Sequence, residues 1–285
     1  MTAISLDLTG KLDPAHERVL RDVAEAAAAH GIPFFVVGAF ARDLILELHY
    51  SLPVQRATND IDLGLQVNFW EEFTQLKIAL MQTQTYHADP RQPQRLHSIT
   101  GEVLDIVPFG GVENSVTRTI LWPPERVIEM NAFGFAEAYQ QSLRVRLATD
   151  LEVQVSSLAG LALMKLVAWQ QRRQAKDAKD LQLILTRYLQ AGNIDRLYSD
   201  AQADLLEEEQ FVSLDLTGAR LLGRDIAVLL SAASQQRVLA MLASPALLVG
   251  SMAGGAFDLE EALASAQMRL EMLSQGIADR PSSEA

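Results

Sequence analysis

The run from Asp60 to Val67 is the segment that most restricts how this chain can fold, because apolar and other residues alternate along it. Side chains of a β-strand point to opposite faces in turn, so a period of two predicts a strand with one apolar face. The other face carries Asp60 and Asp62, one residue apart. The two carboxylates therefore point the same way, into a common space.

Paired carboxylates on a strand need a physical reason. Two like charges on one face repel each other and lose hydration as the strand packs, which costs stability unless a cation compensates. Asp60 and Asp62 are therefore candidate metal ligands. A simpler interpretation makes Asp60 a loop residue or helix cap and Asp62 a solvated strand residue.

A third carboxylate, Asp105, stands in the apolar run from Val103 to Phe109. A carboxylate is costly to bury there unless it is paired or coordinates a metal ion. One interpretation bonds Asp105 to backbone amides or to an arginine. The other places it beside the strand of Asp60 and Asp62, where it would complete a cluster of three carboxylates.

The composition narrows the metals that such a cluster could bind. The chain has no cysteine, so thiolate ligands are excluded, and the remaining oxygen and histidine ligands favour Mg²⁺ or Mn²⁺. The five histidines lack the spacing of a zinc site, and there is no G-x-x-x-x-G-K-[ST] phosphate loop. The formal net charge of −12 repels polyanions, so a polyanionic partner would have to be held locally.

No part of the sequence predicts a membrane segment. The first residues lack the basic and apolar regions of a secretion signal. The longest apolar run, Leu158 to Trp169, is too short to span a bilayer and contains Lys165. We expect a soluble, cytoplasmic protein without a membrane partner.

Hydrophobic periodicity predicts an α/β (α+β) fold with two domains. A helix from Asp13 to Gly31 leads into an apolar strand, a Gly38-Ala39 turn and a second helix. The segment around His87, Pro90 and Pro93 reads as a polar connection. Further strands are expected over 60–67, 103–109, 143–147 and 151–155, with a helix over 69–81. We expect a core with a small mixed sheet flanked by helices over 1–155, and a mostly helical domain over 156–285.

The order of these motifs resembles the DNA polymerase β nucleotidyltransferase superfamily. That family has a strand, a small-residue turn, a helix, a D-x-D pair and a later strand with one more acid. The lysine helix over 158–169 and the segment KDAKD over 176–180 are similar to motifs of the AbiEii-like nucleotidyltransferases, the toxin side of many bacterial toxin–antitoxin pairs. The four motifs together span residues 32–190. Two positions depart from the family pattern, Ala39 where Gly or Ser is usual and Lys176 where arginine is common.

The resemblance implies a role for each motif residue, within a nucleotidyltransferase core and a helical domain that contributes to nucleotide binding. The catalytic carboxylates, which would also hold Mg²⁺ or Mn²⁺, are Asp60, Asp62 and Asp105. The residues that would bind the nucleoside triphosphate are Gly38, Ala39, Arg42, Lys165 and Asp177. The Gly38-Ala39 turn would do so through backbone N–H groups at the start of a helix.

Structural interpretations of the same residues stay open. Arg42 could instead pair with Asp43 on the surface, and Lys165 could form a salt bridge with an acid. The i,i+4 spacing typical of ion pairs on exposed helices occurs twice in the second half, at Arg173/Asp177 and Lys176/Asp180.

The activity that the resemblance implies is transfer of a nucleoside monophosphate from a nucleoside triphosphate to an acceptor hydroxyl. The acceptor stays open among an RNA 3′ end, a protein and a small molecule such as an aminoglycoside, because fold and metal site do not encode it. An antitoxin protein is a possible partner. The alternative is a non-catalytic nucleotide-sensing or partner-binding module on the same fold.

Overall fold

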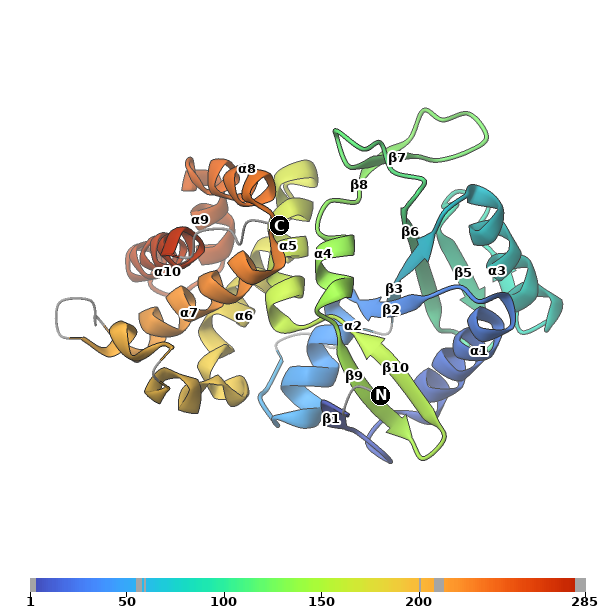
Figure 1. Cartoon of the computed structure of the whole chain (residues 1–285), viewed down its shortest axis with the longest axis horizontal. Coiled ribbons are helices and arrows are strands. Elements are labelled where there is room, and N and C mark those ends of the chain that lie inside the picture. Colours follow the sequence, from blue (N-terminus) through green and yellow to red (C-terminus); the bar gives the residue numbers. More distant parts are fainter. Residues whose placement is uncertain (1–3, 55–57, 59, 200, 208–212, 280–285) are drawn as a thin grey trace. The chain divides into compact units, whose positions relative to one another are not determined.

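The computed structural model describes residues 4–54, 58, 60–199, 201–207 and 213–279 (Figure 1). The chain divides into two compact units, Met1–Ser157 and Leu158–Ala285. The first combines a mixed sheet with helices, and every element described in the second is helical. The predicted α/β fold class is confirmed.

The first unit is built on an eight-stranded mixed sheet. Its strands in spatial order are β1 (Leu6–Asp7), β9 (Leu143–Ala148), β10 (Leu151–Val155), β2 (Phe34–Val37), β3 (Asp60–Val67), β6 (Val103–Gly110), β5 (Arg95–Ser98) and β4 (Tyr86–Ala88). β3 pairs antiparallel with β2 and parallel with β6, so the two strands that carry the predicted acids are neighbours. The predicted apolar face of β3 is buried, with exposures of at most 1% for Ile61, Leu63, Leu65 and Val67.

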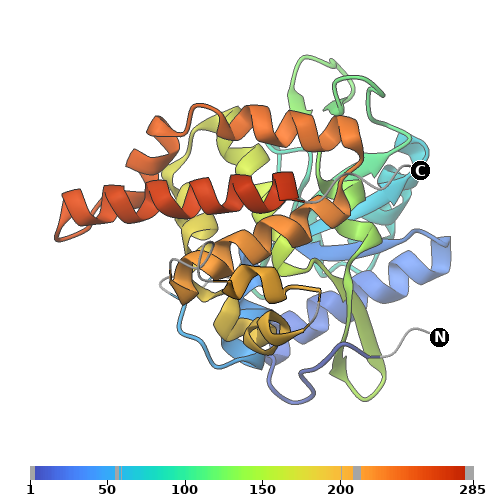
Figure 2. The same ribbon diagram turned by 60° about the vertical axis from the view of Figure 1, so that its left-hand side comes forward.

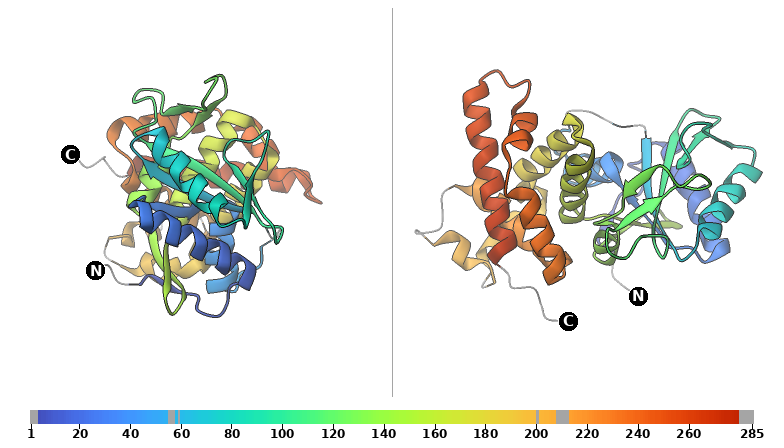
Figure 3. Two further views of the ribbon diagram at one scale, coloured as in Figure 1. Left: turned by 90° about the vertical axis from the view of Figure 1, so that its right-hand side faces the viewer. Right: turned by 90° about the horizontal axis from the view of Figure 1, so that it is seen from above.

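Helices accompany this sheet. They are α1 (Pro14–His30), α2 (Gly38–Asp43), the π-helical η1 (Leu44–His49), α3 (Trp70–Gln82) and α4 (Phe135–Gln140). Those at 14–30, after Gly38 and at 70–82 lie where the sequence predicts them, whereas α4 was not predicted. The Asp13 side chain accepts a hydrogen bond from Ala15 N and starts α1, and Gly31 ends it with a left-handed φ of 65°. α1 and α3 pack side by side (Figure 3).

The segment expected as a polar connection around His87 instead contains β4 and β5. β5 pairs antiparallel with β6 and buries Leu96, while Arg95 and His97 on either side of it point to the opposite face. With so few apolar residues, the hydrophobic pattern cannot reveal this strand. This strand matters for the site, because β5 lies next to β6, which carries Asp105.

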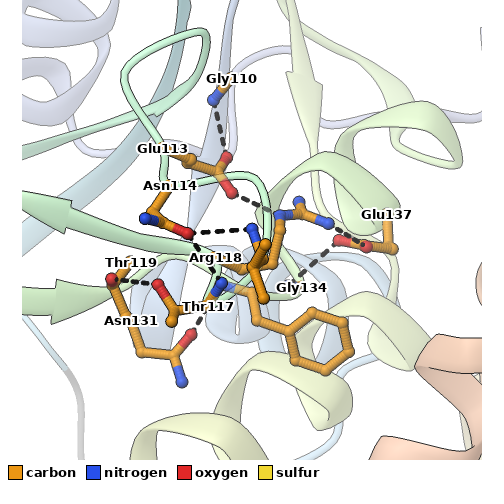
Figure 4. Close-up of polar contacts among 11 residues, drawn as sticks. Gly110, Glu113, Asn114, Thr117, Arg118, Thr119, Asn131, Gly134 and Glu137 are labelled. Carbon is orange, nitrogen blue, oxygen red and sulfur yellow. Dashed lines mark hydrogen bonds and ion pairs between the residues drawn. The ribbon is translucent and has the colours of Figure 1, made fainter.

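A hairpin of β7 (Thr119–Leu121) and β8 (Glu129–Asn131) forms a separate two-stranded sheet. Arg118, at its base, donates to Glu113 at 2.6 Å and to Glu137 at 3.0 Å (Figure 4). These two carboxylates also accept backbone N–H groups, from the end of β6 and the start of α4. One guanidinium therefore joins the hairpin to both elements.

The second unit consists of helices in all its described residues. They are α5 (Leu158–Arg172), α6 (Ala175–Arg187), η2 (Leu189–Asn193), η3 (Ile194–Tyr198), η4 (Ala203–Leu206), α7 (Leu214–Leu229), α8 (Ala232–Leu242), α9 (Ala246–Ala253) and α10 (Leu259–Asp279). Over the described ranges, no single helix is long and apolar enough to cross a membrane. α8 and α9 reach that length and hydropathy only as a pair, bent by 68°.

The longest helix of this unit, α10, packs along α7 (Figure 2). The two backbones touch where Gly276 meets Arg220, since a Cβ on this glycine would lie 1.9 Å from Arg220 O. At the same contact Arg220 and Arg224 both donate to the carboxylate of Asp279, at 2.8 and 2.9 Å. Close packing and ion pairs thus fix α10 on α7.

Candidate active site

The end of β2 brings Gly38 against the side chain of Asp62. The antiparallel register pairs Val37 with Asp62, and Gly38 then begins α2 with a left-handed φ of +70°. A Cβ built on Gly38 would lie 2.0 Å from Asp62 Oδ2. Glycine suits both this backbone conformation and the close approach of the carboxylate. The small-residue turn and the acidic strand therefore meet in the folded unit.

The parallel pairing of β3 with β6 puts Asp105 directly beside Asp62. Their Cα atoms are register partners, as are those of Asp60 and Val103. Side chains in register on neighbouring parallel strands point to the same face, and such strands lie about 4.8 Å apart. All three carboxylates therefore project from one face of the sheet, with Asp60 exposed and the other two half-buried.

The carboxylate of Asp105 is bound by Arg95, its register partner on β5. Arg95 Nε donates to Oδ1 at 2.8 Å and Nη2 donates to Oδ2 at 2.7 Å, which makes the pair bidentate. This hydrogen bonding, with the charges of Asp105, Asp60 and Asp89, raises the pKa of Arg95 against the effect of burial. The guanidinium therefore stays charged, and the arginine-bound interpretation of Asp105 is the one that the structure shows.

The carboxylates fit a hard divalent cation only in part. The oxygen atoms of Asp60 and Asp62 suit Mg²⁺ or Mn²⁺, and Asp62 is backed by Gly38. Both oxygens of Asp105, however, are bonded to Arg95. Among the residues that the structure describes, no three histidine or acidic side chains are arranged to hold a metal ion. Asp60, Asp62 and Asp105 do lie on one face of the sheet. Within the described residues, however, their carboxylates do not converge on a common point that could hold a metal ion.

Arg42 lies inside the first unit. Its side chain is 3% exposed, and Nε donates to Asp43 Oδ1 at 2.7 Å. The pairing with Asp43 is present, but the expected surface position is wrong. The reason is that α2 enters the core directly after Gly38, so that Ala39 and Phe40 are buried as well.

In the second unit, Lys165 and Asp177 belong to an ionic cluster between α5 and α6. Lys165 Nζ on α5 lies 2.6 Å from Asp180 Oδ2 and 3.5 Å from Asp177 Oδ1, both on α6. Arg172, at the end of α5, donates to the two oxygens of Asp177 at 2.6 Å each. Asp177 is fully buried. Lys165 thus has the acidic partners of the salt-bridge interpretation.

The exposed i,i+4 ion pairs expected at Arg173/Asp177 and Lys176/Asp180 are wrong. Arg173, with a φ of 54°, interrupts the two helices and lets α6 pack on α5, so that both acids face α5. The Arg173 guanidinium instead lies 4.1 Å from the ring centroid of Trp169. Spacing within one helix gives no information about such a contact between helices.

The sequence did not predict the partners of Asp105 and Asp177, which are Arg95 and Arg172. A signal for the first was present, because a buried Asp105 requires a partner and Arg95 precedes it by ten residues. For Arg172 the signal is weaker, since its pairing with Asp177 depends on the break between α5 and α6.

Comparison with known proteins places the chain in a family. No curated protein matches it. Among solved structures it is similar to the antibiotic-resistance factor ANT(2″)-Ia, with 13% identity over 70% of this chain and 98% of that one and a TM-score of 0.39. It is also similar to the Thermotoga maritima CCA-adding enzyme complexed with tRNA, with 12% identity over 95% of this chain and 84% of that one and a TM-score of 0.28. Residues 18–247 match the model of the family described as nucleotidyl transferase AbiEii toxin, type IV TA system. Because this match spans most of the chain, the protein belongs to the AbiEii family and is a nucleotidyltransferase.

Proposed function

We propose that the chain transfers a nucleoside monophosphate from a metal-bound nucleoside triphosphate to an acceptor hydroxyl. The acceptor oxygen would form a bond to the α-phosphorus as the bond from that phosphorus to the α,β-bridging oxygen breaks. Pyrophosphate leaves, and the hydroxyl proton passes to a carboxylate of the site or to water. When bound, Mg²⁺ or Mn²⁺ would neutralise the charge that develops on the phosphates.

The observation that supports this proposal most directly is the contact of Gly38 with Asp62. The absence of a side chain on Gly38 makes room for the carboxylate of Asp62, and Asp60 projects from the same face two residues earlier. We assign the metal ion to these two residues. The first backbone N–H groups of α2, at Gly38 and Ala39, would bind phosphate oxygens, since the preceding Val37 provides no side-chain cap for them.

From the second unit we propose Lys165 as a contact of the triphosphate. Its side chain is 13% exposed and its charge is held between Asp180 and Asp177. Asp177 is fully buried between Lys165 and Arg172, so we assign it to positioning these cations rather than to touching the nucleotide itself.

The proposal also covers the biological role of the chain and the acceptor that it modifies. Because the family is described as a toxin, we propose that this chain is the toxin of a toxin–antitoxin pair. Acceptors to be tested are an RNA 3′ end, a protein and an aminoglycoside. With a formal net charge of −12, an RNA acceptor would be held at its end rather than along a large surface.

The decisive experiment incubates the purified chain with each α-³²P-labelled nucleoside triphosphate, Mg²⁺ or Mn²⁺, and tRNA, total cell protein or tobramycin. We expect wild type to label one class of acceptor and Asp62→Asn to label none. Asp195→Asn, which removes the same charge from an exposed acid, should transfer normally. A wild type that binds nucleotide but labels no acceptor would favour the non-catalytic module.

A further inference from the structure

We propose that Arg95 competes with the metal ion for Asp105. This inference rests on the proposed metal-dependent transfer and adds a positioning residue to it. In the metal-free chain the guanidinium holds the third carboxylate, and the site is completed when a divalent cation draws Asp105 away from Arg95.

The register places Asp105 between an acidic neighbour and a basic one. It stands on the central of three strands, with Asp62 in register on β3 and Arg95 in register on β5. Arg95 uses two nitrogens and occupies both carboxylate oxygens, at 2.8 and 2.7 Å. A bidentate pair of this kind fixes the orientation of the carboxylate as well as its charge. Asp105 is thereby turned toward β5, not toward Asp62.

The ion pair of Arg95 and Asp105 has opposite effects on the stability of the metal-free fold and on metal binding. The side chains of Arg95 and Asp105 are only 23% and 15% exposed, so solvent screens their attraction incompletely. Without a cation nearby, Asp60, Asp62 and Asp105 would repel one another across neighbouring strands. Arg95 therefore stabilises the metal-free fold, and by the same contact it opposes metal binding.

A pair that serves only to hold β5 on β6 makes a different prediction. It would stay closed when metal binds, and its removal would lower stability without changing the metal affinity. The dissociation constant for the metal therefore separates the two roles, and it does not depend on knowing the acceptor.

The test uses Arg95→Gln in the full chain, with Mn²⁺ as the probe. We expect the dissociation constant for Mn²⁺ in calorimetry to fall about tenfold, because the ion no longer has to displace a charge-assisted pair. The metal-free thermal midpoint should fall by about 2–4 °C, and saturating Mn²⁺ should restore it. Arg95→Lys keeps the charge but loses the bidentate geometry, so its affinity should lie between the other two.

The matched control is Arg21→Gln. Arg21 on α1 also binds a carboxylate with two nitrogens, since its Nη1 and Nη2 donate at 2.8 and 3.0 Å to Asp150 in the turn between β9 and β10. This variant should leave the Mn²⁺ affinity unchanged. Circular dichroism confirms that each variant is folded before the titration, and Arg95→Lys serves if Arg95→Gln is not.

The outcomes separate the two proposals. If wild type binds Mn²⁺ and Arg95→Gln binds it equally or more weakly, Arg95 is not a competitor, while the proposed transfer stands. If neither wild type nor variant binds Mn²⁺ at millimolar concentration, the metal assignment itself fails and the competition with it. Binding by the variant alone supports the competition in its strongest form.

Discussion

Gly38→Ala tests the contact on which the site depends. The new Cβ would lie 2.0 Å from Asp62 Oδ2, 2.7 Å from Cγ and 2.8 Å from Cβ, all far inside van der Waals contact. A left-handed φ costs an L-residue about 1–2 kcal/mol. Forcing Asp62 off its rotamer adds about 1 kcal/mol. We expect a loss of about 2–3 kcal/mol in the free energy of unfolding.

The control for this substitution is Gly31→Ala. Gly31 has nearly the same φ, +65°, but a Cβ there would meet no atom within 4 Å. It therefore carries the cost of the backbone conformation without the collision. Urea unfolding of both variants should show Gly38→Ala to be the less stable by about 1 kcal/mol.

The metal response provides the second measurement. We expect Mn²⁺ to raise the thermal midpoint of wild type. Because the methyl group displaces Asp62, Gly38→Ala should lose this rise, whereas Gly31→Ala should keep it. Equal stability of the two variants, together with an unchanged Mn²⁺ response in Gly38→Ala, would refute the idea that this glycine makes room for a functional carboxylate.

Two further predictions concern charges outside the acidic strand. Asp177→Asn should cost about 2–3 kcal/mol in urea unfolding, because it leaves Arg172 and Lys165 without their shared buried carboxylate, and a loss under 0.5 kcal/mol would contradict this. Burial, with the hydrogen bond that its hydroxyl donates to Asp22 at 2.7 Å, raises the pKa of Tyr86 well above the ordinary value for a tyrosine. The contribution of Tyr86 to stability is therefore complete below about pH 10 and is lost as the pH rises further. Above about pH 10 the free energy of unfolding should consequently fall less steeply with pH in Tyr86→Phe than in wild type. The same steepness in wild type and variant would disprove it.

Local patterns predicted much of the fold well. The caps Asp13 and Gly31 define α1, and the alternation along 60–67 defines β3 with its buried face. β5 was missed because its single inward apolar residue, Leu96, makes no recognisable pattern. The motifs also identified the family, because each motif is a short stretch of sequence that can be recognised without knowing the fold.

What the sequence determined by itself is where the candidate site residues stand along the chain and which face of β3 carries Asp60 and Asp62. What the tertiary structure decided is the partner of each charge: Arg95 for Asp105 across a strand pair, and Lys165 with Arg172 for Asp177 across a helix break. The physical reason is that periodicity and caps arise from neighbours along the chain. Ion pairs are chosen instead by strand register and helix packing, and buried pairs matter most because solvent screens them least.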